Sequence, residues 1–190
     1  MRPIPKPHTP NPNCGDQKIL IAGFGGQGIM FLGKILSQAA MLEGKNVTYI
    51  RSYGAEMRGG TAHCMVKMSK TDIASPIFEQ ASTAVLMNQP SLDRFLGKIE
   101  KTALLVLNNS LIEKRPKAKG LKIKGRRFNE LALALGSVRV ANIICLGFLL
   151  AQKPLVRISS VRSSLKDIFK NKPDLLRINL QALDKGYKDD

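Results

Sequence analysis

Four glycines that follow an apolar run are the residues best placed to bind an anion. Residues 18–28 read KILIAGFGGQG, so Gly23, Gly25, Gly26 and Gly28 come directly after a run of aliphatic side chains. Glycine accepts a positive φ and lets another group approach the backbone closely. A glycine turn between a strand and a helix also presents backbone N–H groups at the helix N-terminus, where anions are stabilised. The segment therefore predicts a turn that binds an anion or allows close packing.

Gly23, Gly25 and Gly28 satisfy the G-x-G-x-x-G fingerprint of dinucleotide-binding turns. The full fingerprint needs an acid about 20 residues further on to hold a ribose hydroxyl, but the second predicted strand ends in Tyr-Ile-Arg. Arg51 could contact a 2′-phosphate, so a free-standing NADP-binding oxidoreductase is an alternative. A P-loop is excluded because isoleucine and methionine follow Gly28. The glycines could also serve only to pack a helix closely on the sheet.

A second loop, residues 52–60 with the sequence SYGAEMRGG, could bring a cation to the same region. Arg58 is followed by two glycines, so its guanidinium has room to contact a phosphate or a carboxylate. Glu56 and Arg58 could equally pair with each other or with a neighbouring chain. The candidate interface residues of this loop are Tyr53, Glu56, Arg58, Gly59 and Gly60. Contacts to a cofactor anion or to an interface are expected at Gly23, Gly25, Gly26, Gln27, Gly28 and Arg58.

The sequence offers no recognisable catalytic group and no metal site. The three cysteines, Cys14, Cys64 and Cys145, are far apart and form no C-x-x-C pair, which favours reduced thiols over a metal site or a disulfide framework. His8 and His63 are the only histidines, and no Ser-His-Asp set or carboxylate pair accompanies them. We therefore expect a chain that binds and docks but does not run a reaction alone.

The composition predicts one cytoplasmic domain. The chain has 190 residues, of which 44% are apolar, and no apolar run approaches the roughly 18 residues of a membrane span. No signal-peptide pattern opens the chain. Residues 1–16 hold five prolines and are expected to form an extended, flexible tail, followed by one domain over residues 17–190.

The net charge of +16 is concentrated in the second half of the chain, because residues 114–127 hold eight basic residues and no acidic one. This basic loop favours acidic partners, and a nucleic-acid-binding protein is a second alternative. Aromatic residues make up only 5% of the chain, Trp is absent and Phe128 alone adjoins the stretch, so a base-stacking platform is poor and nucleic acid is an unlikely partner. The stretch could also receive an acidic ferredoxin.

Alternating strand and helix patterns predict an α/β fold. Strands are expected at 18–23, 46–51, 61–69, 83–87 and 103–107, with a short one at 121–123. Helices are expected at 27–43, ended by Gly44, then after Pro90 with Ile99 on the inner face, at 129–135 and at 138–151. Two more follow, one capped by Ser159 or Ser160 and one from Pro173 to a stop at Gly186. The expected fold is a Rossmann-like, mostly parallel sheet with helices on both faces, in a single domain.

The two loops together resemble the gamma subunit of 2-oxoacid:ferredoxin oxidoreductases. The likeness rests on GFGGQG at 23–28, a helix, SYGAEMRGG at 52–60 and an alternating strand, and extends from residue 18 through residue 111. It includes the turn at residues 75–76 and Asn108, and Asn142, Gly147 and Gly186 also look similar. Members of this family act on pyruvate, 2-oxoglutarate, branched-chain 2-oxoacids or indolepyruvate.

The resemblance implies that the chain is a non-autonomous part of a larger enzyme. Such enzymes decarboxylate a 2-oxoacid oxidatively with coenzyme A and reduce ferredoxin. Thiamine diphosphate is held mainly by alpha and beta subunits, and iron–sulfur clusters pass electrons on, usually through a ferredoxin-like subunit. This chain is expected to bind no cofactor alone. The glycine turn and Arg58 would either hold an anionic part of the cofactor set, such as a CoA phosphate, or shape the interface over it.

Overall fold

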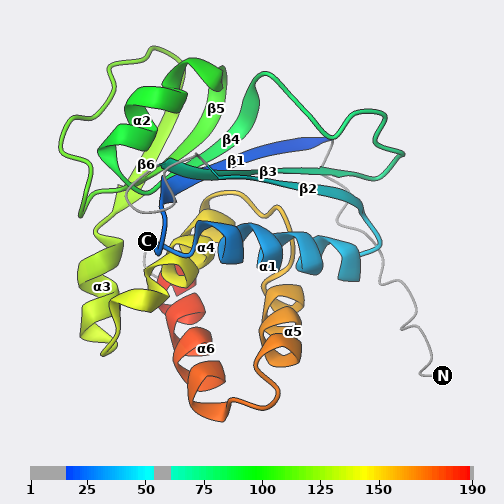
Figure 1. Cartoon of the computed structure of the whole chain (residues 1–190), viewed down its shortest axis with the longest axis vertical. Coiled ribbons are helices and arrows are strands. Elements are labelled where there is room, and N and C mark those ends of the chain that lie inside the picture. The colour runs from blue at the N-terminus through cyan, green and yellow to red at the C-terminus, as the bar shows by residue number, and fades with distance from the viewer. Residues whose placement is uncertain (1–15, 54–60, 189–190) are drawn as a thin grey trace.

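The computed structural model describes residues 16–53 and 61–188, which form a six-stranded sheet with helices on both faces (Figure 1). The strands are β1 (Gln17–Phe24), β2 (Asn46–Tyr53), β3 (Thr61–Ser69), β4 (Ala81–Leu86), β5 (Ile99–Asn108) and β6 (Lys122–Arg126). Their order in the sheet is β2-β3-β1-β4-β5-β6. Strand β3 runs antiparallel to both of its neighbours, and every other neighbouring pair is parallel. The predicted mostly parallel α/β sheet is therefore confirmed.

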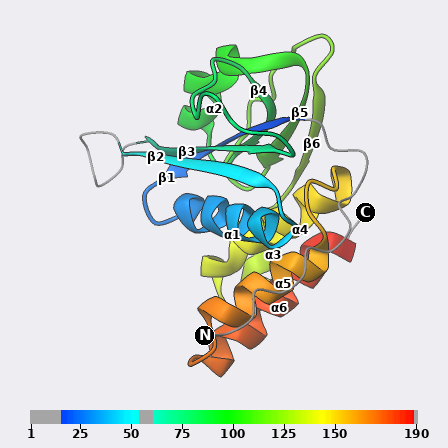
Figure 2. The same ribbon diagram turned by 90° about the vertical axis from the view of Figure 1, so that its right-hand side faces the viewer.

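The helices divide unequally between the two faces of the sheet. Figure 2 shows α2 (Gln89–Phe95) on one side, and α1 (Ile29–Leu42), α4 (Ala141–Gln152), α5 (Ile158–Ile168) and α6 (Pro173–Lys188) on the other. The remaining helical elements are η1 (Leu96–Lys98), α3 (Phe128–Ala134) and η2 (Val138–Val140). In the part of the chain that the structure describes, no helix is long and apolar enough to cross a membrane.

Strand β1 has buried side chains on both of its faces, as its continuous apolar run predicts. Ile19 and Ile21 belong to the larger core under α1 and α4, whereas Leu20 and Ala22 belong to the smaller core under α2. Because successive side chains of a strand point to opposite faces, β1 joins the two cores at the centre of the sheet.

The predicted stop of the last helix at Gly186 is wrong, because α6 continues to Lys188. Glycine is needed there for another reason. A Cβ atom at Gly186 would overlap the carbonyl of Ile144 on α4, and one at Gly147 would overlap the carbonyl of Leu183 on α6. The two glycines therefore let the backbones of α4 and α6 approach each other, and this contact overrides the helix-ending preference of glycine.

Two further expectations are corrected at element ends. Ile99 does not extend the helix after Pro90 but begins β5, although its side chain still packs into the smaller core. Helix α5 begins at Ile158, and neither Ser159 nor Ser160 caps it. Instead, the carboxylate of Glu43 reaches it from the end of α1.

The Glu43 carboxylate closes the junction between α1 and α5. Its Oε1 accepts hydrogen bonds from the Arg157 N–H at 2.5 Å and from the Ser160 hydroxyl at 2.9 Å. Its Oε2 forms an ion pair with Lys45 Nζ at 3.1 Å, and both side chains are almost fully buried. Lys45 Nζ also donates to the carbonyl of Leu155 at 2.6 Å. A glutamate at the end of α1 therefore accepts a hydrogen bond from a backbone N–H at the start of α5.

Candidate functional site

The glycine turn lies at the carboxyl end of β1 and leads directly into α1. Gly26 has a φ of 95° and Gly28 a φ of 73°, in the left-handed region that favours glycine. The turn is closed by a hydrogen bond from the Gln27 N–H to the carbonyl of Phe24, at 3.2 Å. Gly25 and Gly26 are exposed at the tip. The predicted strand–turn–helix arrangement is therefore present, with β1 continuing through Phe24 and α1 beginning at Ile29.

Packing explains two of the glycines. A Cβ atom at Gly23 would lie 2.6 Å from Gln27 Oε1, and one at Gly28 would overlap the Asn142 side chain. Asn142 stands at the start of α4 and donates to the Gly28 carbonyl at 3.1 Å. A Cβ atom at Gly26, in contrast, would meet no atom within 4 Å. Close packing thus accounts for Gly23 and Gly28, while the exposed tip is free to meet a partner or a ligand.

Gln27 turns its side chain back into the sheet instead of toward solvent. Its Oε1 accepts hydrogen bonds from the Phe24 N–H at 2.6 Å and from Asn88 Nδ2 at 2.9 Å. Its Nε2 donates to the carbonyl of Met87 at 3.4 Å. After β1 the chain continues toward one side of the sheet, and after the neighbouring parallel strand β4 it continues toward the other side. Open α/β sheets bind ligands in the crevice between the carboxyl ends of two such strands. In this chain the Gln27 amide occupies that crevice.

Asn88 ties the same crevice to α2. The asparagine is buried, and its Oδ1 accepts the Ser91 N–H at 2.9 Å, which caps the helix. Asn88 is not among the residues predicted from the sequence. The signal was nevertheless present, because an asparagine two residues before Pro90 is a typical helix start. Its pairing with Gln27, 61 residues away, had no local signal.

Asn108 continues the row of amides along the carboxyl ends of the strands. Its Nδ2 donates to Asn129 Oδ1 at 3.1 Å, and its Oδ1 accepts the Phe128 N–H at 3.2 Å. Asn108 is fully buried. The amide therefore fixes the end of β5 against the start of α3, and this rim of the sheet is held by hydrogen bonds between side chains and backbone.

The second loop begins and ends at the same edge of the sheet as the glycine turn. Tyr53 pairs with Ala62, which pairs with Gly23, and Phe24 pairs with Thr61. Strand β3 lies between β1 and β2, so the second loop connects β2 to the strand next to β1, and the two loops meet the sheet at neighbouring strand ends. Glu56, Arg58, Gly59 and Gly60 lie outside the described residues, as does the side chain of Tyr53.

The inserted strand also separates Arg51 from the glycine turn. Arg51 is exposed on β2, an edge strand, and β3 lies between it and β1. Neighbouring strands lie about 4.8 Å apart, so Arg51 is about two strand spacings from the turn. In the dinucleotide fold, the residue that contacts the ribose lies on the strand adjacent to the glycine turn. The arrangement therefore disfavours an NADP site built from the glycine turn and Arg51.

A hollow of about 580 Å³ opens beside Gly28, on the face of the sheet that carries α1, α4 and α6. Its apolar lining includes Phe31 and Phe169, whose rings are 5.7 Å apart. Two exposed cations, Arg139 and Arg177, also line it. These residues come from separate helical elements, and neither arginine was predicted from the sequence as a site residue.

The basic stretch 114–127 forms a loop and then the edge strand β6. Lys122 and Lys124 are exposed on that strand, and the Arg126 guanidinium stacks over the Phe148 ring at 5.7 Å. Phe128, the one aromatic residue adjoining the stretch, is fully buried. A base-stacking surface at this stretch would therefore lack its only adjacent aromatic ring, which weakens the nucleic-acid alternative.

The described thiols are poor nucleophiles. Burial raises the pKa of the Cys64 thiol to about 12 and raises that of Cys145 as well. Both cysteines are free. Among residues 16–53 and 61–188 there is no group of three or more His, Cys, Asp or Glu side chains that could hold a metal ion.

The chain is similar in sequence to known proteins of one family. The family described as "Pyruvate ferredoxin/flavodoxin oxidoreductase" matches residues 18–188. The ketoisovalerate oxidoreductase subunit VorA of Methanothermobacter marburgensis is 34% identical over 184 residues, which cover 96% of this chain and 38% of VorA. The 2-oxoglutarate synthase subunit KorC of Methanocaldococcus jannaschii is 30% identical over 179 residues, 90% of this chain and 92% of KorC. The chain thus spans well under half of VorA but nearly all of KorC.

Solved structures share the fold at lower identity. The gamma subunit of a keto/oxoacid ferredoxin oxidoreductase from Geobacter sulfurreducens superposes with a TM-score of 0.77 at 24% identity, covering 90% of this chain and 96% of that one. A 2-oxoglutarate:ferredoxin oxidoreductase from Magnetococcus marinus gives 0.84 at 24% identity, covering 92% of this chain and 31% of the longer one. The chain therefore belongs to the pyruvate ferredoxin/flavodoxin oxidoreductase family and has the fold of its gamma subunits.

Proposed function

We propose that the chain is the gamma-type subunit of a 2-oxoacid:ferredoxin oxidoreductase that depends on thiamine diphosphate and iron–sulfur clusters. The family match over residues 18–188 carries this proposal. The reaction of the complex is the oxidative decarboxylation of a 2-oxoacid with CoA, which gives an acyl-CoA and CO₂ and transfers two electrons to ferredoxin. This chain supplies docking and positioning, and its partners are the alpha and beta subunits and a ferredoxin-like subunit.

The cysteines within residues 16–53 and 61–188 do not fit an iron–sulfur cluster. Such clusters are held by sets of cysteine thiolates, whereas Cys64 and Cys145 are buried on different elements and their thiols have raised pKa values. We therefore assign the clusters and thiamine diphosphate to the companion subunits. Free thiols are typical of reducing compartments, which supports a cytoplasmic complex.

We define the docking edge as the end of the sheet at which β1 leads into the glycine turn. Gly25 and Gly26 expose backbone there, and the second loop starts from the same edge. The hollow beside Gly28 adds Arg139 and Arg177. Coenzyme A carries several phosphate charges, and arginine side chains and exposed backbone N–H groups are the groups that bind phosphate.

We assign to this edge either a contact to a CoA phosphate or the shaping of the interface over it. The structure of the Magnetococcus marinus enzyme is described as having 2-oxoglutarate, coenzyme A and succinyl-CoA bound, so CoA is a ligand in that relative. In this chain, Arg58 is the guanidinium that the second loop contributes to the CoA contact. Gly23, Gly28 and Gln27 hold the turn in place, because they pack against or bond to the chain itself.

Anaerobic co-purification tests the assignment to a complex. The chain is tagged in its host, isolated without oxygen, and its companion chains are identified by mass spectrometry. The proposal predicts companions that carry thiamine diphosphate and iron–sulfur clusters, and ferredoxin reduction that depends on both a 2-oxoacid and CoA. The purified chain alone should bind no NADP. Isolation as a free protein that binds NADP tightly would instead support the oxidoreductase alternative.

A further inference from the structure

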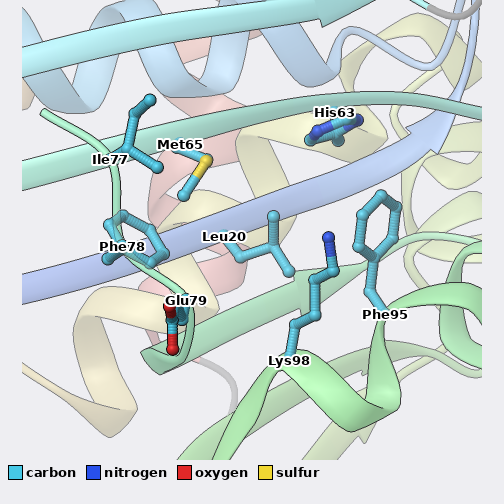
Figure 3. A pocket seen from close by; sticks show the side chains of 8 residues that line it. All are labelled: Leu20, His63, Met65, Ile77, Phe78, Glu79, Phe95 and Lys98. Carbon is cyan, nitrogen blue, oxygen red and sulfur yellow. The ribbon is translucent and has the colours of Figure 1, made fainter.

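The second face of the sheet carries a hollow of about 300 Å³ that the proposed docking edge does not use (Figure 3). Its floor is formed by Leu20 on β1 and Met65 on β3, which are paired in the sheet. Helix α2 packs against β1 and β4 on this face, so the floor at β3 is left open. The hollow therefore lies across the sheet from the one beside Gly28, and the two can bind separately.

The side walls of this hollow are apolar. Ile77 and Phe78, from the segment before β4, face the floor on one side, and Phe95 of α2 closes the other (Figure 3). Ile77 is 65% exposed. A volume of 300 Å³ corresponds to about ten water molecules at roughly 30 Å³ each. The space suits the body of a small organic molecule and is at the lower limit of ligand-site volumes.

The Phe95 end of the hollow is positively charged. Lys98 extends into it (Figure 3), with Nζ 6.0 Å from the centre of the Phe95 ring, and the Arg94 guanidinium carbon lies 5.3 Å from the same centre. Within residues 16–53 and 61–188, no carboxylate forms an ion pair with either cation. Glu79 lines the opposite end, below Phe78 (Figure 3). An unpaired amine therefore faces an apolar floor.

His63 completes this end of the hollow. Its imidazole packs on Phe95 with ring centres 4.7 Å apart. Its Nδ1 is buried, and it has no hydrogen-bond partner among the described residues. Burial, followed by the charges of Arg94 and Lys98, lowers the pKa of His63, so the ring is neutral at pH 7. A neutral imidazole has one N–H donor and one acceptor nitrogen, so its N–H can donate to an anion that the charges of Arg94 and Lys98 attract.

We propose that this hollow binds a small organic anion, namely a carboxylate attached to an apolar body. The carboxylate contacts Lys98 and His63, and the apolar body lies on Leu20 and Met65 between Phe78 and Phe95. An inorganic anion would leave the apolar floor uncovered, and an uncharged apolar ligand would leave the Lys98 amine unpaired. The site is separate from the hollow beside Gly28, because the two lie on opposite faces of the sheet.

Titration of the full 190-residue chain with three probes tests the site. Phenylacetate has both the charge and the apolar body, acetate lacks the body, and phenylacetamide lacks the charge. The observable is the ¹³C-labelled histidine ring signal of His63, which a His63→Gln variant assigns because the chain has only two histidines. Phenylacetate should shift this signal saturably and bind at least about tenfold more tightly than either other probe.

Two lysine variants make the test specific. Lys98→Gln should weaken phenylacetate binding about tenfold, because a charge-assisted contact is lost. Lys166→Gln, which removes an exposed charge from α5 across the sheet, should leave the affinity unchanged. Equal affinity for acetate and phenylacetate, or an unchanged affinity in Lys98→Gln, would overturn the proposal. The absence of saturable phenylacetate binding would overturn it as well.

Discussion

Gln27 and Asn88 join their side-chain amides across the carboxyl ends of β1 and β4, with Asn88 Nδ2 2.9 Å from Gln27 Oε1. The two residues lie in the crevice where parallel α/β sheets usually receive a nucleotide. The Gln27 side chain occupies that crevice, so the glycine sequence forms a structural turn here although it resembles a dinucleotide-binding one. The exposed tip of the turn, and not its interior, is the part available to partners.

Replacing Gln27 with Ala should lower the free energy of unfolding by about 1–3 kcal/mol, because the Phe24 N–H and the Asn88 amide lose their acceptor. Urea unfolding followed by circular dichroism measures the change. Gln181→Ala, on the exposed side of α6, is the control and should stay within about 0.5 kcal/mol of the wild type. An equal decrease in unfolding free energy in the two variants would show that the turn does not depend on the Gln27 amide.

Gly186→Ala should disrupt the contact between α4 and α6. The added methyl group would overlap the Ile144 carbonyl, and overpacking of this kind costs about 1–3 kcal/mol or more. Gly97→Ala is the matched control, because a Cβ atom there meets nothing within 4 Å. Thermal unfolding should show a lower midpoint for Gly186→Ala alone. A Gly186→Ala protein as stable as the wild type would mean that α6 can shift away from α4 without cost.

Glu43→Gln should remove the negative partner of a buried amine. Breaking a buried ion pair from one side costs about 3–5 kcal/mol, because the remaining charge is left uncompensated. The double change Glu43→Gln with Lys45→Met should recover part of that loss. Glu130→Gln, which breaks the exposed pair with Arg127 at 3.7 Å, should cost about 1 kcal/mol or less. Stability of Glu43→Gln equal to that of Glu130→Gln would refute a strong buried pair.

His63 should make the folded state less stable in acid. Its pKa in the folded protein lies below the ordinary value of 6.5, so the unfolded chain binds more protons at that position. Stability therefore rises with pH through this range and falls as the pH drops below about 6.5. Between pH 7.5 and 5.5, His63→Gln should lose less unfolding free energy than the wild type. Identical pH dependence in the two proteins would contradict the assignment.

Local patterns predicted the elements better than their arrangement. Strand β3 has the predicted limits, because strict alternation of side chains marks a strand with two different faces. Its antiparallel insertion between β1 and β2 could not be predicted, since strand order depends on pairing between distant residues. The length of α6 was misjudged because the sequence signal of a helix-ending glycine is identical to that of a glycine at a helix–helix contact.

The candidate site was only partly predictable for the same reason. The glycine turn has a local signature, and the structure places it where that signature requires. The hollow beside Gly28 combines Arg139 with Arg177, which come from separate elements and carry no shared motif. The hydrogen bond of Gln27 to Asn88 also joins two residues at strand ends that are 61 residues apart in the sequence.

The Michaelis constant for CoA in the assembled enzyme is the decisive measurement of whether this edge contacts CoA. Arg58→Ala should raise this constant by about tenfold or more, because a guanidinium contact to a phosphate is lost, while the subunits remain assembled. Arg51→Ala, an exposed arginine on β2, is the matched control and should leave the constant unchanged. An unchanged Michaelis constant in Arg58→Ala, with assembly intact, would contradict the proposal that this edge of the chain contacts CoA.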